Sequence, residues 1–221
     1  MIKAVAMDMD GLMFDTEALA LEGWKHVGEQ LGIDIPESLI MEMVGLDVDQ
    51  SAAACERHYG CRVDFDSWRK MRIRWVWDYI EANGMPVKPG LMELLGYLKE
   101  RGYLSIVATS SHRYAVDFYF EKAGLTDYFD QIVSAEAVRL RKPDPAIYRK
   151  ASEMLGVRPE QCMALEDSPV GILAACRAGM KPVMIPDLIR PDKETEKLLY
   201  ACVNDLTEVI PLLERDRQSH G

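Results

Sequence analysis

An acidic residue stands at the end of the first apolar run of this chain, and a second acid follows two positions later. The run covers residues 2–7 and is followed by Asp8, Asp10 and Gly11. A buried strand holds its backbone rigidly, so a carboxylate at its carboxyl end is aimed at the crevice beyond the sheet. Glycine lets the chain turn and brings Asp10 beside Asp8. Because close carboxylates repel each other, the pair predicts a cation or a proton between them, although a plain turn at a strand end is the alternative.

A second pair of acids, Glu166 and Asp167, follows a later apolar run at residues 163–165. Ser168 and Pro169 come next and are typical of an N-cap and a first helical residue, so we expect a helix to begin there. If both runs are strands of one parallel sheet, their carboxyl ends meet at one edge and the four carboxylates converge. Oxygen ligands of this kind select a hard ion, so the sequence predicts a Mg²⁺ site.

Three hydroxyl residues, Thr109, Ser110 and Ser111, lie between a strand-like run at 104–108 and a helical pattern at 114–122. The free N–H groups and the dipole at the start of a helix bind anions, so we expect a phosphate site here. Simple N-capping of the helix by Ser110 or Ser111 is the alternative that this run alone leaves open.

Lys142 precedes Pro143, Asp144 and Pro145. Pro143 biases Lys142 away from helical angles, and Pro145 suits the start of a helix. The backbone therefore fixes the lysine, and its ammonium group could contact a phosphoryl oxygen and Asp8 at once. A solvated loop lysine is the alternative.

Strand-like and helical segments alternate along most of the chain, which predicts an α/β fold with a Rossmann-like parallel sheet. The expected strands cover residues 4–7, 104–108, 131–133, 163–165 and 182–185. The span 15–86 has no comparable strand signal, and its apolar residues recur at helical spacing. We therefore expect an α/β catalytic core formed by residues 1–14 and 87–221, and an inserted α-helical cap domain formed by residues 15–86.

The 221 residues are 48% hydrophobic and carry a formal net charge of -10. This excess of negative charge argues against a nucleic-acid partner and against docking on an anionic membrane. The five cysteines suggest no disulfide framework, and the chain shows neither a membrane-length apolar run nor a signal-peptide pattern, so we expect a cytoplasmic protein. The expected partner is a small phosphorylated metabolite, and the expected assembly is a monomer or a weak homodimer.

Taken together and in this order, the motifs resemble those of the haloacid dehalogenase superfamily, in the branch that contains β-phosphoglucomutase and small phosphatases with a helical cap. The matching segments are DMDGLMFDTE, VATSS, RKPDP and LEDSPVGILAA. The resemblance implies a Mg²⁺-dependent phosphatase of small phosphate monoesters, sugar phosphates above all, that acts through an aspartyl phosphate. A sugar phosphomutase of the β-phosphoglucomutase type is the alternative, and a non-catalytic protein that binds a phosphate ligand is a less favoured one.

The resemblance also implies a role for each motif residue. Asp8 resembles the nucleophile that takes the phosphoryl group. Asp10 resembles the general acid and base. Thr109 and the amide of Ser110 would hold the phosphoryl oxygens, and Lys142 would neutralise their charge.

Metal and substrate ligands follow from the same resemblance. The implied Mg²⁺ ligands are Asp8, the backbone carbonyl of Asp10, Glu166 and Asp167. Gly45 and Ser111 are expected to contact the substrate.

The cap departs from the β-phosphoglucomutase pattern. Those enzymes carry a histidine, a lysine and an arginine at cap positions that align with Ala20, Val44 and Val48 of this chain. A mutase must hold a second phosphate while the sugar reorients, and the loss of two cations weakens that grip, so phosphatase is favoured over mutase. Arg72 and Arg74 could replace the missing cations, but a solvated helix face is the favoured interpretation for both.

Overall fold

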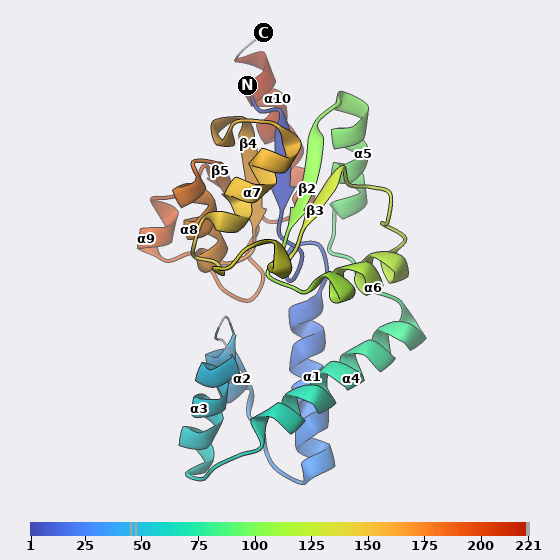
Figure 1. The fold of residues 1–221 in the computed structure, drawn as a ribbon, viewed down its shortest axis with the longest axis vertical. Helices are drawn as coiled ribbons and strands as arrows, with labels where there is room; N and C mark the ends of the chain where they lie inside the picture. Colours follow the sequence, from blue (N-terminus) through green and yellow to red (C-terminus); the bar gives the residue numbers. More distant parts are fainter. Residues whose placement is uncertain (45, 47, 220–221) are drawn as a thin grey trace. The chain divides into compact units, whose positions relative to one another are not determined.

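The computed structural model describes residues 1–44, 46 and 48–219 (Figure 1). The chain forms two compact units, one built from Met1–Asp15 with Met85–Gly221 and the other from Thr16–Gly84. Within the described ranges, none of the helices is both long and apolar enough to cross a membrane.

A parallel sheet of six strands, in the order β3-β2-β1-β4-β5-β6, forms the centre of the first unit (Figure 1). The strands are β1 (Ala4–Met7), β2 (Leu104–Ala108), β3 (Gln131–Val133), β4 (Cys162–Glu166), β5 (Lys181–Met184) and β6 (Ala201–Cys202). This sheet confirms the expected α/β, Rossmann-like fold, and β1 to β5 lie within one residue of their expected bounds. The two-residue strand β6 was not expected, because it is too short for a periodic signal.

Helices cover this sheet. They are α5 (Leu91–Arg101), α6 (Arg113–Ala123), α7 (Ala146–Leu155), α8 (Pro169–Ala178), α9 (Lys193–Glu196) and α10 (Val209–Gln218), with short 3₁₀ turns η1 (Ala135–Ala137), η2 (Pro159–Gln161) and η3 (Leu206–Glu208). On one face, Ala4 and Ala6 of β1 share a buried cluster with Ile147 and Tyr148 of α7 and Ala175 of α8. The other residues of β1 are buried as well, as expected for a parallel sheet covered on both faces.

The strand order places β1 at the point where the direction of the chain across the sheet reverses. Strand β1 pairs with β2 on one side and with β4 on the other. In that register, the residue before Asp8 in β1 is paired with the residue before Ala108 in β2 and with the residue before Glu166 in β4. Asp8, Ala108 and Glu166 therefore lie side by side at the carboxyl edge, where open parallel sheets bind their ligands.

The described residues of the second unit form only helices: α1 (Thr16–Leu31), α2 (Glu37–Met43), α3 (Val48–Tyr59) and α4 (Phe65–Asn83). Its core contains Trp24, which stacks on Phe65 with ring centroids 5.6 Å apart. Trp68 of α4 packs against the same cluster. These three aromatic residues thus serve packing, as the helical spacing of the apolar residues indicates.

Two segments of the first unit carry the chain to and from the second unit, and they are paired with each other. The N–H of Asp15 donates to the carbonyl of Pro86 (3.0 Å), and the N–H of Lys88 donates to that of Met13 (2.9 Å). The ammonium group of Lys88 also lies 3.0 Å from Asp15 and 2.6 Å from Asp187, in the loop after β5. The ion pairs hold both segments to the core.

Candidate active site

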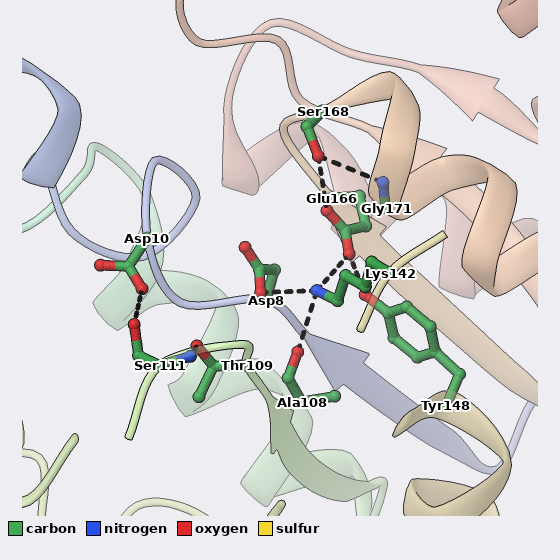
Figure 2. A network of polar contacts seen from close by, with 10 residues as sticks. All are labelled: Asp8, Asp10, Ala108, Thr109, Ser111, Lys142, Tyr148, Glu166, Ser168 and Gly171. Carbon is green, nitrogen blue, oxygen red and sulfur yellow. Dashed lines mark hydrogen bonds and ion pairs between the residues drawn. The ribbon is translucent and has the colours of Figure 1, made fainter. Parts of the chain in front are cut away.

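The ammonium group of Lys142 lies between two carboxylates at the carboxyl edge of the sheet (Figure 2). Its nitrogen is 2.7 Å from Asp8 Oδ1 and 2.6 Å from Glu166 Oε1, and it donates to the carbonyl of Ala108 at 3.1 Å. All three charged side chains are largely shielded from solvent. The lysine therefore binds the ends of β1, β2 and β4 together.

Local sequence directs this lysine inward. Pro145 is the N-cap residue of α7, and the N–H of Ala146 is satisfied by the carboxylate of Asp144 at 2.9 Å. Lys142 therefore stands just before a fixed helix start, as the two prolines indicate. Burial lowers the pKa of Lys142, but the charges of Asp8 and Glu166 raise it more, so the net shift is upward. The lysine thus stays charged.

Tyr148 is a member of this site that the sequence did not reveal. Its hydroxyl donates to Glu166 Oε1, and the centroid of its ring lies 5.0 Å from the Lys142 ammonium (Figure 2). The side chain is fully buried on the inner face of α7. A tyrosine on the apolar face of a helix gives only a packing signal, so the polar role was visible only in the fold.

Glu166 is held by the start of α8 as well as by Lys142. Ser168 is the N-cap residue of that helix, as expected: its hydroxyl accepts from the N–H of Gly171 at 3.2 Å and lies 3.4 Å from Glu166 Oε2. A Cβ atom at Gly171 would lie only 1.9 Å from Glu166 Oε2. The glycine thus makes the space that the carboxylate occupies. Burial raises the pKa of Glu166, and Lys142 opposes that shift.

Three carboxylates, from Asp8, Glu166 and Asp167, have oxygens within 4.8 Å of one another. Gly11 permits this approach, because its φ is +76° and a Cβ atom there would lie 2.4 Å from Asp167 Oδ2. Three negative charges face the single ammonium of Lys142, so a divalent cation would compensate the remainder. The donors are all oxygens, a set that fits Mg²⁺.

The carboxylate of Asp10 is not a member of this acidic group, although the acid pattern placed four carboxylates together. Its Oδ2 accepts instead from the hydroxyl of Ser111 at 2.6 Å (Figure 2). The N–H of Ser111 donates to Thr109 Oγ1 at 2.9 Å. A short hydrogen-bonded turn after β2 therefore fixes the Asp10 side chain beside the cluster.

The same turn separates β2 from helix α6. The N-cap residue of α6 is His112, which makes no side-chain capping bond, so neither Ser110 nor Ser111 caps the helix. Thr109 is buried and Ser110 is exposed. Their expected contacts with a phosphoryl group stay predictions.

Comparison with known proteins agrees with this arrangement of motifs. The model of the haloacid dehalogenase-like hydrolase family matches residues 5–185, which include all the motif residues of the core. The chain belongs to that family. This membership confirms the resemblance inferred from the four segments.

Relatives of this haloacid dehalogenase-like hydrolase include both phosphatases and phosphomutases. Hexitol phosphatase B of Escherichia coli is 30% identical over 193 residues, 84% of each chain. The beta-phosphoglucomutase of Bacillus subtilis is 30% identical over 185 residues, 81% of each chain. The crystal structure of CbbY from Rhodobacter sphaeroides in complex with phosphate has a TM-score of 0.78 and 25% identity, and the match covers 95% of this chain and 96% of that chain.

These findings support the expected enzyme class, a phosphatase of the haloacid dehalogenase-like family. Phosphatases of this family generally use a metal ion, and the acidic group of Asp8, Glu166 and Asp167 agrees with that.

The structure also distinguishes Arg72 and Arg74, the two arginines considered as replacements for the missing cations. Arg74 is exposed and pairs with Asp78 at 3.6 Å, as expected for a solvated face. Arg72 does not lie on such a face: its guanidinium lies 5.5 Å from the ring centroid of Trp24, beside a cavity. Residues two apart point in different directions on a helix, and aromatic faces attract guanidinium groups.

Gly45, for which the sequence predicts a contact with the substrate, lies outside the described residues.

Proposed function

We propose that this protein hydrolyses small phosphate monoesters, sugar phosphates above all, in a Mg²⁺-dependent reaction through an aspartyl phosphate. The contact of Lys142 with both Asp8 and Glu166, next to Asp167, carries this proposal. An ammonium group among buried acids fits a site where negative charge arrives with a phosphate and leaves again. The named activities of the relatives point to the same class of substrate.

In the first step, a carboxylate oxygen of Asp8 attacks phosphorus and the ester oxygen leaves. Asp10 donates a proton to that oxygen, because an alkoxide is a poor leaving group. The hydroxyl of Ser111 holds the Asp10 carboxyl group in place through its 2.6 Å contact. Lys142 offsets the charge on Asp8 and on the phosphoryl group, while Thr109 and the amide of Ser110 bind phosphoryl oxygens.

In the second step, Asp10 accepts a proton from water, which attacks the aspartyl phosphate and releases phosphate. Asp8 is thereby restored. Mg²⁺, when bound, would neutralise phosphoryl and carboxylate charge, and its ligands would be Asp8, the backbone carbonyl of Asp10, Glu166 and Asp167.

The test is the release of inorganic phosphate from a panel of sugar phosphates and an aryl phosphate, with Mg²⁺ and with EDTA. We expect turnover only with Mg²⁺, and none from Asp8→Asn. Asp78→Asn is the matched control, because this exposed carboxylate of α4 pairs only at the surface with Arg74. Failure of the wild-type protein to release phosphate from every member of the panel would refute the proposal in favour of a binding protein.

A phosphomutase is the second candidate, because the Bacillus subtilis beta-phosphoglucomutase is 30% identical to this chain. Ala20, Val44 and Val48 stand where the resemblance places a histidine, a lysine and an arginine of the mutase cap, and the loss of the two cations among them favours hydrolysis. β-Glucose 1-phosphate distinguishes the two: conversion to glucose 6-phosphate indicates a mutase, and free phosphate indicates a phosphatase.

We also propose that the enzyme acts in the cytoplasm, as a monomer or weak homodimer, on a small phosphorylated metabolite.

A further inference from the structure

The α/β unit contains a cavity at the amino edge of its sheet, with a volume of about 370 Å³. Its lining includes Lys3, directly before β1, and Leu104, the first residue of β2. The start of β1 and the end of α10 lie together at this end of the unit (Figure 1). Asp8 follows the other end of β1, so the cavity and the candidate active site lie at opposite edges of the sheet. A cavity of this volume is in the size range of small-molecule sites.

Three cationic side chains line this cavity: Lys3, Arg101 in the last turn of α5, and Arg217 in the last turn of α10. The described lining contains no carboxylate. None of the three cations forms an ion pair with an acid in the part of the chain that the structure describes. Positive charge is thus gathered here in a chain whose formal net charge is -10.

The acid next to Arg217 in the sequence, Asp216, is engaged elsewhere. Its carboxylate accepts from the N–H of Ile2 at 2.5 Å and pairs with Lys181 at 2.8 Å. It therefore does not offset the charge in the cavity. The dipole at a helix C-terminus stabilises a cation, which accounts for Arg101 and Arg217 one by one. It does not account for their meeting Lys3 at a single cavity.

An aromatic pair holds the two arginines in place. Arg101 Cζ lies 5.6 Å from the ring centroid of Tyr97, and that ring stacks on Tyr103 with centroids 6.2 Å apart. The Tyr103 hydroxyl donates to the carbonyl of Leu213 in α10 at 3.5 Å, which links the two helices. Burial raises the pKa of Tyr103, and the charges of Arg217 and Arg101 oppose that shift, so both guanidinium groups lie near this phenol.

The walls of the cavity indicate what kind of anion fits. Tyr103, Leu104 and Val157 form apolar surface beside the cations. Guanidinium groups pair best with planar or tetrahedral oxyanions, to which they donate two parallel hydrogen bonds. A guanidinium held against an aromatic face also loses less conformational freedom when a ligand binds. The lining therefore suits an oxyanion that carries an apolar group.

We propose that this cavity binds an organic oxyanion, a phosphate or carboxylate group attached to an apolar group. Because the length of the sheet separates the cavity from Asp8, such a ligand is bound in addition to the molecule that reacts there. The site does not depend on the proposed phosphatase function.

NMR titration of the 221-residue protein in EDTA tests the proposal without turnover. The probes are phenylphosphonate and, separately, phenylacetate, with benzyl alcohol as the uncharged control. We expect both anions to shift the backbone amide signals of Gly102 and Val157, which line the cavity, and benzyl alcohol to leave them unchanged. The amide signal of Ser111 reports separately on the candidate active site. The ratio of the two affinities identifies whether the site prefers phosphate or carboxylate.

Matched variants identify the cations that bind the ligand. We expect at least about tenfold weaker binding in Arg101→Met and in Arg217→Met, since hydrogen bonds to charged groups are the strong ones. Arg217→Lys keeps the charge but not the planar fork, so its affinity should lie between those of wild type and Arg217→Met. Arg215→Met is the control, because Arg215 is exposed on the same helix and does not line the cavity. All four substitutions are at exposed residues, and far-ultraviolet circular dichroism checks their folding.

Three results would overturn the site. These are the absence of shifts at Gly102 and Val157 in the folded protein, equal affinity for benzyl alcohol, and equal weakening by Arg215→Met. The titration contains no Mg²⁺ and measures no phosphate release. Failure of phosphate release would thus refute the proposed function alone, and failure of the titration would refute this site alone.

Discussion

The hydroxyl of Tyr148 donates a hydrogen bond to the carboxylate of Glu166, and both side chains are buried beneath the candidate active site. The same carboxylate oxygen contacts Lys142 at 2.6 Å. One oxygen of Glu166 is thus held by two donors, and its other oxygen lies close to Ser168. Glu166 is therefore oriented before any metal ion or substrate binds.

Tyr148→Phe removes one of these donors and keeps the ring beside Lys142. Because the groups that orient a metal ligand tune its affinity, we expect the Mg²⁺ concentration for half-maximal activity to rise by about 10–100-fold. Phosphate release measured against Mg²⁺ concentration is the test. Tyr114→Phe is the control, since Tyr114 is 60% exposed. An unchanged Mg²⁺ dependence would show that Tyr148 has a packing role only.

Asp10→Asn separates proton transfer from metal binding. The Asp10 carboxylate bonds with Ser111 and lies outside the acidic group, so we expect unchanged Mg²⁺ affinity by calorimetry. We expect kcat to fall by about 10²–10⁴-fold, the usual contribution of a general acid and base. Loss of Mg²⁺ binding in this variant would contradict the assignment.

Gly171→Ala tests the space that Glu166 occupies. A methyl group would overlap the carboxylate, so we expect the free energy of unfolding to fall by about 1–3 kcal/mol, as in overpacked sites. Gly96→Ala in α5 is the matched control, because nothing lies within 4 Å of its Cβ position. That substitution should stabilise the protein by about 0.5–1 kcal/mol. Urea unfolding measures both, and equal effects would rule out the steric explanation.

Asp216 links the stability of the core to pH. Its carboxylate accepts from the N–H of Ile2 at 2.5 Å and pairs with Lys181 at 2.8 Å. Burial raises the pKa of Asp216, but these donors lower it more, so the pKa lies below the ordinary 3.8. A lowered pKa means that the stabilisation is complete above the unfolded-state pKa and is lost as the pH falls through the folded-state pKa.

Asp216→Asn should therefore lower the free energy of unfolding by about 1–3 kcal/mol near neutral pH. The difference from the wild-type protein should shrink as the pH falls below the unfolded-state pKa, because the wild-type carboxyl group then becomes neutral as well. Urea unfolding of both proteins over a series of pH values measures this difference in the free energy of unfolding. A difference that stays constant over the acid range would mean that the ionised form of Asp216 adds no stability.

The order and spacing of the motifs determined most of the core. Apolar runs with acids or hydroxyls at their carboxyl ends predicted β1, β2 and β4, because the parallel pattern brings those ends to one edge. Ser168 and Pro169 determined the start of α8, because the N-cap side chain and the proline act within a single turn. Local chemistry of this kind is readable from the residues alone.

Only the tertiary structure decided which groups meet. The acid pattern could not separate Asp10 from the other carboxylates, since Ser111, its partner, is 101 positions away. In the sequence, Tyr148 is only one residue of a helical pattern and Gly171 is only a glycine within a helix. Their roles depend on Glu166 lying against α7 and α8. Arg72 and Arg74 differ by two positions in sequence, but only the packing of α4 on Trp24 separates a cavity residue from a solvated one. Long-range packing, not residue type, sets such contacts.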